Sequence, residues 1–317
     1  MKRVLKILIS AGFLGLALYI LDWEALKSAL FELNPIILVL VTVFLVSEYV
    51  ILGARWFLLI NPIASLGYVE HLRRYMLAVF FSSVTPAQLG GDAYRFFSIK
   101  GEGGRALDVF SILVRERFLG LVSFILFFLL CLLAHLWATD WADITWSNVF
   151  VSSGVLLAAG FVVAIPISKA LERLDAASLF AERPAINKLL SVSVTAVSLR
   201  PLRLVSRVLM LGLLAALVWG LAIVWLSHDL GLPITLAAAG MVGILADLIR
   251  LIPVTVQGIG VREATFAYLF DQLGYSPEIG FIVGTVAYLA VSLSLILAGA
   301  IGGLMTVQKA TIDADKV

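Results

Sequence analysis

Residues 84–95 read Val-Thr-Pro-Ala-Gln-Leu-Gly-Gly-Asp-Ala-Tyr-Arg, and residues 252–263 read Ile-Pro-Val-Thr-Val-Gln-Gly-Ile-Gly-Val-Arg-Glu. Each stretch interrupts an apolar segment with a proline, a glutamine, two glycines and an arginine close to a carboxylate. Proline and paired glycines break helices, and a broken helix at membrane depth is tolerated only where protein buries it or where it lines a cavity. Paired breaks at corresponding places in two halves of a chain indicate a transport site.

The composition is that of an integral membrane protein. Of the 317 residues, 62% are hydrophobic and only 14% are charged, and the mean hydropathy is +1.06. Soluble domains have about 25% charged residues, so a soluble core has no room for this much apolar surface. Segments of about ten residues with alternating polarity are absent, which predicts helices and not a barrel. Cys131 is the single cysteine, which excludes disulfides within the chain and cysteine metal sites.

Several stretches are long and apolar enough to cross a bilayer, which takes about 20 residues per helix. Residues 75–97 and 233–274 are also apolar but contain the two interruptions, and we predict that each forms a re-entrant hairpin. The first apolar run lacks a small-residue cleavage site, so we interpret it as a retained span and not as a signal peptide. The predicted full-length spans are roughly 4–21, 36–60, 109–137, 148–168, 205–227 and 279–306.

The loop charges predict the orientation. The loops on one side hold Asp22, Glu24, Glu32, Asp140, Asp143, Asp229, Asp271 and Glu278, against Lys27 alone. The positive-inside rule therefore places both termini in the cytoplasm, provided that each interrupted stretch returns to the side from which it starts. The alternative is eight ordinary spans with proline kinks. The basic residues assigned to the cytoplasmic side are Lys2, Arg3, Lys6, Arg55, Arg73, Arg74, Lys100, Arg105, Lys169, Arg173, Arg183, Lys188, Arg200, Arg203, Arg207, Lys309 and Lys316.

This orientation predicts an inverted-topology repeat, because span, hairpin and span run in opposite directions in the two halves. The expected fold is an all-α integral membrane protein, a polytopic helical bundle with two re-entrant broken-helix hairpins. We expect one membrane domain over residues 1–317, made of an extra N-terminal span over 1–35, a first repeat over 36–168, a cytoplasmic linker over 169–204 and a second repeat over 205–317.

Some charged residues lie in or beside the apolar elements. A charge at the centre of the bilayer costs about 2.5–3.5 kcal/mol on the insertion scale, so such residues normally face a cavity or a partner. Asp92 and Arg95 are three residues apart, as are Asp247 and Arg250, so each pair shares a helix face. Glu116 and Arg117 are adjacent and point in different directions, so Glu116 is expected to pair across helices. The arginines concerned are Arg95, Arg115, Arg117, Arg250 and Arg262.

The pattern predicts an anion site. We expect a half-helix to begin after Gly90 and Gly91 and another after Gly260, each presenting free backbone N–H groups, with Arg95 and Arg262 in or near the first turns. Guanidinium groups match phosphate oxygens in a bidentate fashion. Two such ends approaching from opposite leaflets build a pocket for a phosphate. The alternative is that the arginines only pair internally and hold the broken helices together.

The candidate site residues follow from these features. Gln88 and Gln257 either satisfy the backbone of the turns or contact the substrate. The other candidates are Arg95, Arg262, Asp92, Glu263, Arg250, Glu116 and Arg117, with structural breaks at Pro86, Gly90, Gly91, Pro253, Gly258 and Gly260. Nucleotide-binding loops, His/Cys clusters and Ser/His pairings are absent from the sequence, so we expect no catalytic residue, cofactor, metal or nucleic-acid partner.

The elements Pro86-x-x-x-Gly90-Gly91-Asp92-x-x-Arg95, Arg115-Glu116-Arg117 and Pro253-x-x-x-x-Gly258-x-Gly260-x-Arg262-Glu263 resemble the lysylphosphatidylglycerol synthase transmembrane-region family, also called the flippase-like domain family. The resemblance covers about residues 5–306. It implies movement of lipids across a membrane, in phospholipid, polyprenyl-glycolipid or hopanoid pathways. The lysyl-transfer enzymes have a separate soluble domain at the C-terminus, and this chain ends at Val317, so the resemblance does not imply lysyl transfer.

The expected function is flipping of an anionic phospholipid or polyprenyl-phosphate-type lipid across the bacterial inner membrane. The expected partners are membrane lipids with anionic headgroups, together with cell-envelope biosynthesis proteins. Three alternatives stay open: a secondary transporter for a small anion, a non-transporting accessory subunit of a glycolipid or cell-envelope pathway, and an intramembrane lipid-modifying enzyme. With no nucleotide site, the energy comes from a gradient, from a partner or from simple equilibration.

Overall fold

The computed structural model describes residues 34–64, 66–83, 85, 89–100, 105–138, 153, 201–250 and 260–314. These residues form eight α-helices, and none of them is in a strand. Two of the predicted spans lie outside the described residues, 4–21 entirely and 148–168 except for residue 153. The linker up to residue 200 also lies outside them. Pro86, Gln88, Pro253, Gln257 and Gly258 also lie outside them.

Four long helices are apolar enough to cross a membrane, and they cover the predicted spans over 36–60, 109–137, 205–227 and 279–306. At 1.5 Å per residue, even the shortest is about 39 Å long, which exceeds the hydrocarbon core of about 30 Å. The chain is therefore a helical, multi-pass membrane protein. The helices are α3 (Pro35–Ile60), α6 (Ala106–Ala138), α10 (Leu202–Asp229) and α13 (Pro277–Ala314).

Each interrupted stretch forms two short helices, as the Pro/Gly breaks predict. They are α4 (Tyr68–Ser83) and α5 (Leu89–Lys100) in the first half, and α11 (Leu236–Arg250) and α12 (Val261–Gln272) in the second. Near the middle of α4, Arg74 donates to the backbone carbonyl of Ser98, close to the end of α5, over 2.9 Å. Near the end of α4, the ring of Phe81 stacks on that of Tyr94 with centroids 5.1 Å apart. Helices α4 and α5 are therefore antiparallel and form a hairpin.

The glycines of the two breaks act differently. We expected α5 to begin after Gly90 and Gly91, but it begins at Leu89, so both glycines lie in its first turn. A Cβ on Gly91 would lie 2.5 Å from the backbone oxygen of Ala78, so the missing side chain lets α5 approach α4 closely. Gly260 does precede its helix, and its φ of 83° lies in the region that favours glycine.

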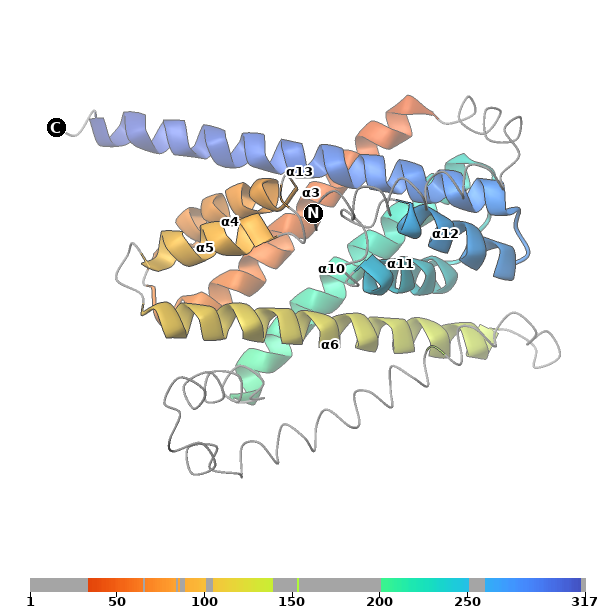
Figure 1. Cartoon of the computed structure of the whole chain (residues 1–317), viewed down its shortest axis with the longest axis horizontal. Helices are drawn as coiled ribbons and strands as arrows, with labels where there is room; N and C mark the ends of the chain where they lie inside the picture. Colours follow the sequence, from red (N-terminus) through yellow and green to blue (C-terminus); the bar gives the residue numbers. More distant parts are fainter. Residues whose placement is uncertain are drawn as a thin grey trace, which may run out of the picture.

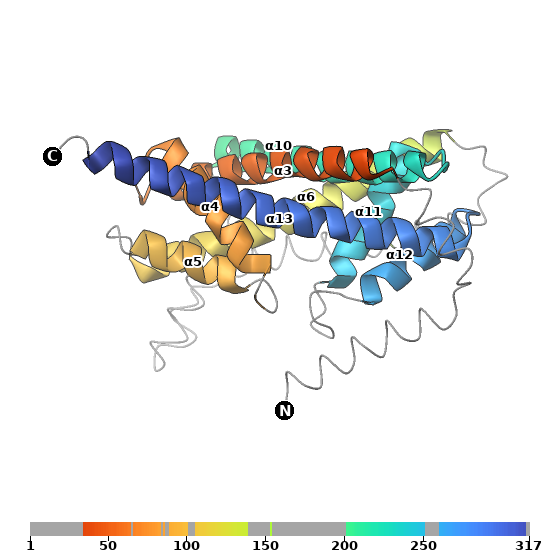
Figure 2. The ribbon, with the colours of Figure 1, turned by 90° about the horizontal axis from the view of Figure 1, so that it is seen from above.

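Helices α3 and α10 form an antiparallel pair at one face of the bundle (Figures 1 and 2). The backbone N–H of Asn34, at the start of α3, donates to the carboxylate of Asp229, at the end of α10, over 2.8 Å. Further along, the rings of Phe44 and Trp225 lie 4.8 Å apart. At the other end of the pair, Leu59 of α3 belongs to the same buried cluster as residues near the start of α10.

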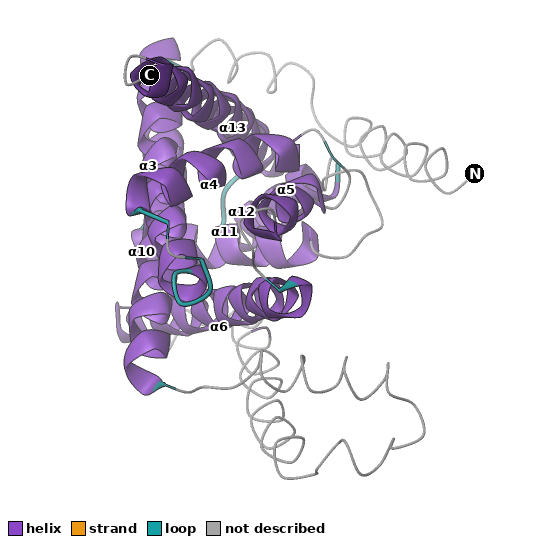
Figure 3. Ribbon diagram, turned by 90° about the vertical axis from the view of Figure 1, so that its left-hand side faces the viewer, coloured by secondary structure: helices purple, strands orange, loops and turns teal. Residues whose placement is uncertain are grey.

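The two pairs of short helices lie between α13 and α6, on the same side of the α3–α10 pair (Figure 3). Figure 1 shows α4 and α5 towards one end of the bundle and α11 and α12 towards the other. The start of α4 meets the end of α13, where Arg73 donates to the hydroxyl of Thr306 over 2.7 Å. The pair α4 and α5 therefore lies at one end of the long helices, and the pair α11 and α12 lies at the opposite end.

The helix contacts of the described residues have an internal symmetry. Exchanging α3, α4, α5 and α6 for α10, α11, α12 and α13 leaves the set of main contacting helix pairs unchanged. Thus α13 packs on α3 and α4, and α6 packs on α10 and α11, while the α3–α10 pair maps onto itself. The two halves therefore have the same pattern of main helix contacts, with α3 and α10 at their boundary.

Candidate functional site

All eight helices contribute side chains to one cavity of about 280 Å³. Its wall contains residues from the first half, such as Tyr75 of α4, and from the second half, such as Tyr288 of α13. Charged side chains are concentrated there although the helices are mostly apolar. Among the described residues, four arginines and three carboxylates line the cavity, namely Arg55, Arg95, Arg117, Arg262, Glu48, Glu116 and Asp247.

Arg95 is buried, and its partners come from several helices. Its guanidinium forms ion pairs with Asp92 on its own helix and with Glu116 on α6. It also lies over two aromatic faces, 4.6 Å from the ring centroid of Trp56 and 5.4 Å from that of Tyr75. Arg95 lies in the second turn of α5, near the start of the helix, and these contacts hold its guanidinium in place.

The ion pairs join into a chain in which guanidinium groups and carboxylates alternate. Glu116 contacts Arg55 on α3 over 3.3 Å with one oxygen and contacts Arg95 with the other. Asp92 contacts Arg95 with one oxygen and Arg117 over 2.8 Å with the other. The structure therefore has both predicted pairings, that of Asp92 with Arg95 and that of Glu116 across helices.

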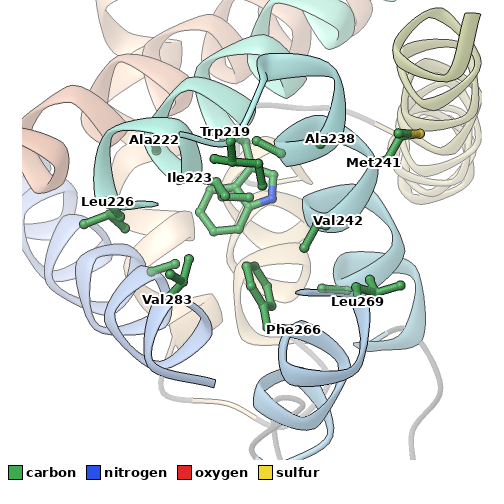
Figure 4. Close-up of a cluster of buried hydrophobic side chains, with 14 of the residues drawn as sticks. Trp219, Ala222, Ile223, Leu226, Ala238, Met241, Val242, Phe266, Leu269 and Val283 are labelled. Carbon is green, nitrogen blue, oxygen red and sulfur yellow. The ribbon is translucent and has the colours of Figure 1, made fainter. Parts of the chain in front are cut away.

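Arg262 is a buried arginine of the second half, and only 1% of it is exposed. It lies in the first turn of α12, as expected, with its guanidinium 5.0 Å from the ring centroid of Trp219 and 5.5 Å from that of Tyr288. Figure 4 shows the Trp219 side chain in the apolar cluster that also contains Phe266 and Val242. This cluster fixes the indole against which Arg262 packs.

The two halves thus share one structural element. In each, an arginine on the second short helix lies over a tryptophan on the first long helix, Arg95 over Trp56 and Arg262 over Trp219. Cation–π contacts of desolvated groups contribute about 2 kcal/mol. The aromatic faces therefore hold both guanidinium groups at the cavity wall independently of any anion.

Glu263 has a local role. Its carboxylate accepts the backbone N–H of Gly260 over 2.7 Å, and it lies outside the cavity lining. This contact caps the first turn of α12, where a backbone donor has no partner within the helix. Glu263 therefore stabilises the break that positions Arg262.

Some candidates lie outside the described residues. These are Gln88 and Gln257, and the same holds for the side chain of Arg250. Asp92 is described but does not line the cavity, and it acts through Arg95 and Arg117. Among the described residues, no group of His, Cys, Asp and Glu has the arrangement of a metal site.

Arg55 is a cavity residue that our sequence interpretation placed elsewhere. We counted it with the basic residues near the link after the second span, on the cytoplasmic side, but it lies inside α3, with 11% of its side chain exposed. Its guanidinium lies beside two glycines, because a Cβ on Gly120 would be 3.4 Å away and one on Gly212 3.6 Å away. Arg55 and Glu48 both fall within the predicted 36–60 span, and a charge inside a span is the signal that would have found them.

Membrane-length helices around a buried, charged cavity define a polytopic membrane protein with an internal polar site. The sequence model of the lysylphosphatidylglycerol synthase TM region matches residues 3–306, so the chain belongs to this family. The family name associates the chain with lipid handling, as the sequence motifs predicted. Comparisons with curated proteins and with solved structures give no match.

Proposed function

We propose that the protein moves an anionic lipid across the bacterial inner membrane, with the headgroup passing through the cavity while the acyl tails stay in the bilayer. The supporting observation is that arginines from both halves, including Arg95 and Arg262, line one cavity of about 280 Å³. Guanidinium groups bind phosphate oxygens in a bidentate fashion. This space suits a phosphate headgroup but not the two tails of a lipid, which therefore remain outside.

A lateral entrance along α6 supports a lipid, and not a small soluble anion, as the substrate. Arg117 and Leu121 both line the cavity from α6, yet 51% of the Arg117 side chain and 38% of Leu121 are exposed. The cavity wall therefore continues onto the outer surface of a membrane-length helix. A headgroup can enter there with its tails still in contact with the bilayer, whereas a carrier for a small anion needs a closed pocket.

We further propose that the halves form an inverted-topology repeat with two re-entrant hairpins. The antiparallel α3–α10 pair and the exchangeable helix contacts support a twofold relation perpendicular to the long helices. Such an axis lies in the membrane plane, and it relates two conformations that open to opposite leaflets. The hairpins enter from opposite sides, the first from the cytoplasm and the second from outside.

The proposed activity is transport without a chemical step. The partners are membrane lipids with anionic headgroups, and cell-envelope biosynthesis proteins that supply or consume such lipids. Both termini lie in the cytoplasm in this scheme, because the basic loops lie on their side.

The test is lipid translocation in vesicles that contain the purified protein. Fluorescent phosphatidylglycerol in one leaflet is scored by a quencher that does not cross the bilayer, with fluorescent phosphatidylcholine as the comparison lipid. We expect translocation of the anionic lipid, loss of activity in Arg95→Ala and Arg262→Ala, and retention in Arg73→Ala, because Arg73 contacts Glu70 and Thr306 away from the cavity. Equal activity in all variants, or uptake of radiolabelled phosphate in place of lipid, would overturn the proposal.

A further inference from the structure

The charges that the described residues bring to the cavity are balanced. Its four arginines face three lining carboxylates, and Asp92 supplies a fourth through its pairs with Arg95 and Arg117. Buried charges without partners are costly, and the ion pairs avoid that cost. An anion that enters the cavity meets, at Arg55, Arg95 and Arg117, guanidinium groups that already bind carboxylates. An anion that binds these arginines therefore replaces one of the carboxylates.

We propose that Glu116 is an internal anion that a phosphate group displaces from Arg55 and Arg95. Only 3% of the Glu116 side chain is exposed, and its two oxygens contact arginines from two different helices. All three side chains line the cavity. A carboxylate and a phosphate offer the same pair of acceptor oxygens to guanidinium groups, so one can take the place of the other. This inference rests on the proposed function, in which the cavity receives a headgroup phosphate.

Asp92 does not suit this role. It lies outside the cavity lining and shares a helix with Arg95, three residues away. An anion in the cavity therefore does not reach the position of its carboxylate. Asp92 remains with Arg95 and Arg117 while Glu116 exchanges with the anion.

The arginines keep their positions when Glu116 leaves. Arg95 is held by the faces of Trp56 and Tyr75, 4.6 and 5.4 Å from their ring centroids. Arg55 lies against the backbone of Gly120, where a Cβ would come within 3.4 Å of its guanidinium. The two donors are therefore preorganised for an anion that bridges them, and a carboxylate that competes for them keeps binding weak enough for release.

The test is infrared difference spectroscopy of the protein in nanodiscs, with carboxylate bands assigned by ¹³C-labelled glutamate. Inorganic phosphate is added in one arm, and phosphatidylglycerol replaces phosphatidylcholine in the other. We expect a shift in a glutamate carboxylate band that is absent in Glu116→Gln. A shift in both arms or in the lipid arm alone supports displacement, and the lipid-only result identifies the headgroup as the source of the phosphate. No glutamate shift in either arm, measured on the wild-type protein, overturns the inference even if Glu116→Gln fails to fold.

Affinity gives a second measurement with a matched control. Glu116→Gln should bind the ligand that causes the shift at least about tenfold more tightly, because a competing hydrogen bond to a charged group is worth that factor or more. Asp247→Asn removes the same charge from the same cavity, so it controls for net charge alone. An equal gain in Asp247→Asn would overturn the specific role of Glu116.

The inference and the proposed function fail in different ways. A glutamate shift with inorganic phosphate, together with no lipid translocation in vesicles, keeps Glu116 as the displaced anion and removes the lipid function. Lipid translocation with an unchanged glutamate band keeps the function and removes the displacement.

Discussion

Asn34 donates its backbone N–H to the carboxylate of Asp229 over 2.8 Å, which joins the beginning of α3 to the end of α10. These residues are far apart in the sequence, and each lies beside a different membrane-length helix. The contact places both helix ends on the same side of the membrane. The orientation of the whole chain can therefore be tested at a few positions.

We expect Asn34→Cys and Asp229→Cys, each on a Cys131→Ser background, to react with an impermeant maleimide added to intact cells from outside. Ala185→Cys, in the predicted cytoplasmic linker, should react only after the cells are permeabilised. Reaction at position 185 from outside would contradict the inverted-repeat scheme, and opposite results at positions 34 and 229 would contradict the antiparallel pair.

Gly91→Ala should destabilise the α4–α5 hairpin. The new methyl group would meet the backbone oxygen of Ala78 at 2.5 Å, and a backbone atom has little freedom to move. Overpacking of this kind costs about 1–3 kcal/mol. Thermal unfolding in detergent measures the effect. Gly67→Ala is the control, because nothing lies within 4 Å of a Cβ at that position. Equal melting temperatures for the two variants would show that α5 tolerates a wider separation from α4.

Gly260→Ala should reduce transport as well as stability. Gly260 has a φ of 83°, where a side chain adds strain of about 1–3 kcal/mol. The same residue precedes α12 and sets the position of Arg262 in the cavity. Gly274 also has a φ of 83°, but nothing lies within 4 Å of a Cβ there. Gly274→Ala should therefore lose stability and keep lipid translocation. Full translocation in Gly260→Ala would show that transport does not depend on a glycine at this break.

Arg95→Lys and Arg262→Lys should each lose at least about tenfold in lipid translocation, because an ammonium group does not reproduce the planar fork that makes two parallel hydrogen bonds to one anion. Arg73→Lys serves as the control outside the cavity. Expression and thermal stability are measured in parallel, so that loss of folding is recognised.

The charge-neutral double variant Arg95→Ala with Asp92→Ala should also fail to transport. It leaves Glu116 without one of its two arginines, and it removes a cavity donor. Recovery of activity by this double variant would assign Arg95 to structure and remove the main support for a headgroup site.

Much of the helical arrangement was accessible from the sequence. Long apolar runs and Pro/Gly breaks predict the long helices and the division of 75–97 and 233–274 into helix pairs, because both signals are local. The role of Gly90 and Gly91 was not accessible, since it depends on the backbone of α4 on the other side of the turn. A spacing pattern does not distinguish a glycine that ends a helix from one that allows close packing.

The site was only partly predictable for a similar reason. The arginines beside the breaks and the spacing of Asp92 and Arg95 are visible in the sequence. The contacts of Arg55 with Glu116 and of Arg262 with Trp219 join distant helices, and membrane helices that are apolar on all sides give little periodicity from which to infer a facing partner. A stricter treatment of charges inside spans would have added Arg55 and Glu48.

The alternating chain from Arg55 to Arg117 has a consequence for biogenesis. Helix α6 carries Glu116 and Arg117 within a membrane-length segment, and each charge at the bilayer centre costs about 2.5–3.5 kcal/mol on the insertion scale. The side chains that pair with these two residues belong to α3 and α5, which the ribosome makes earlier. Contact with α3 and α5 therefore lowers the cost of placing α6 in the bilayer, and we expect α6 to insert more efficiently beside these two helices than alone.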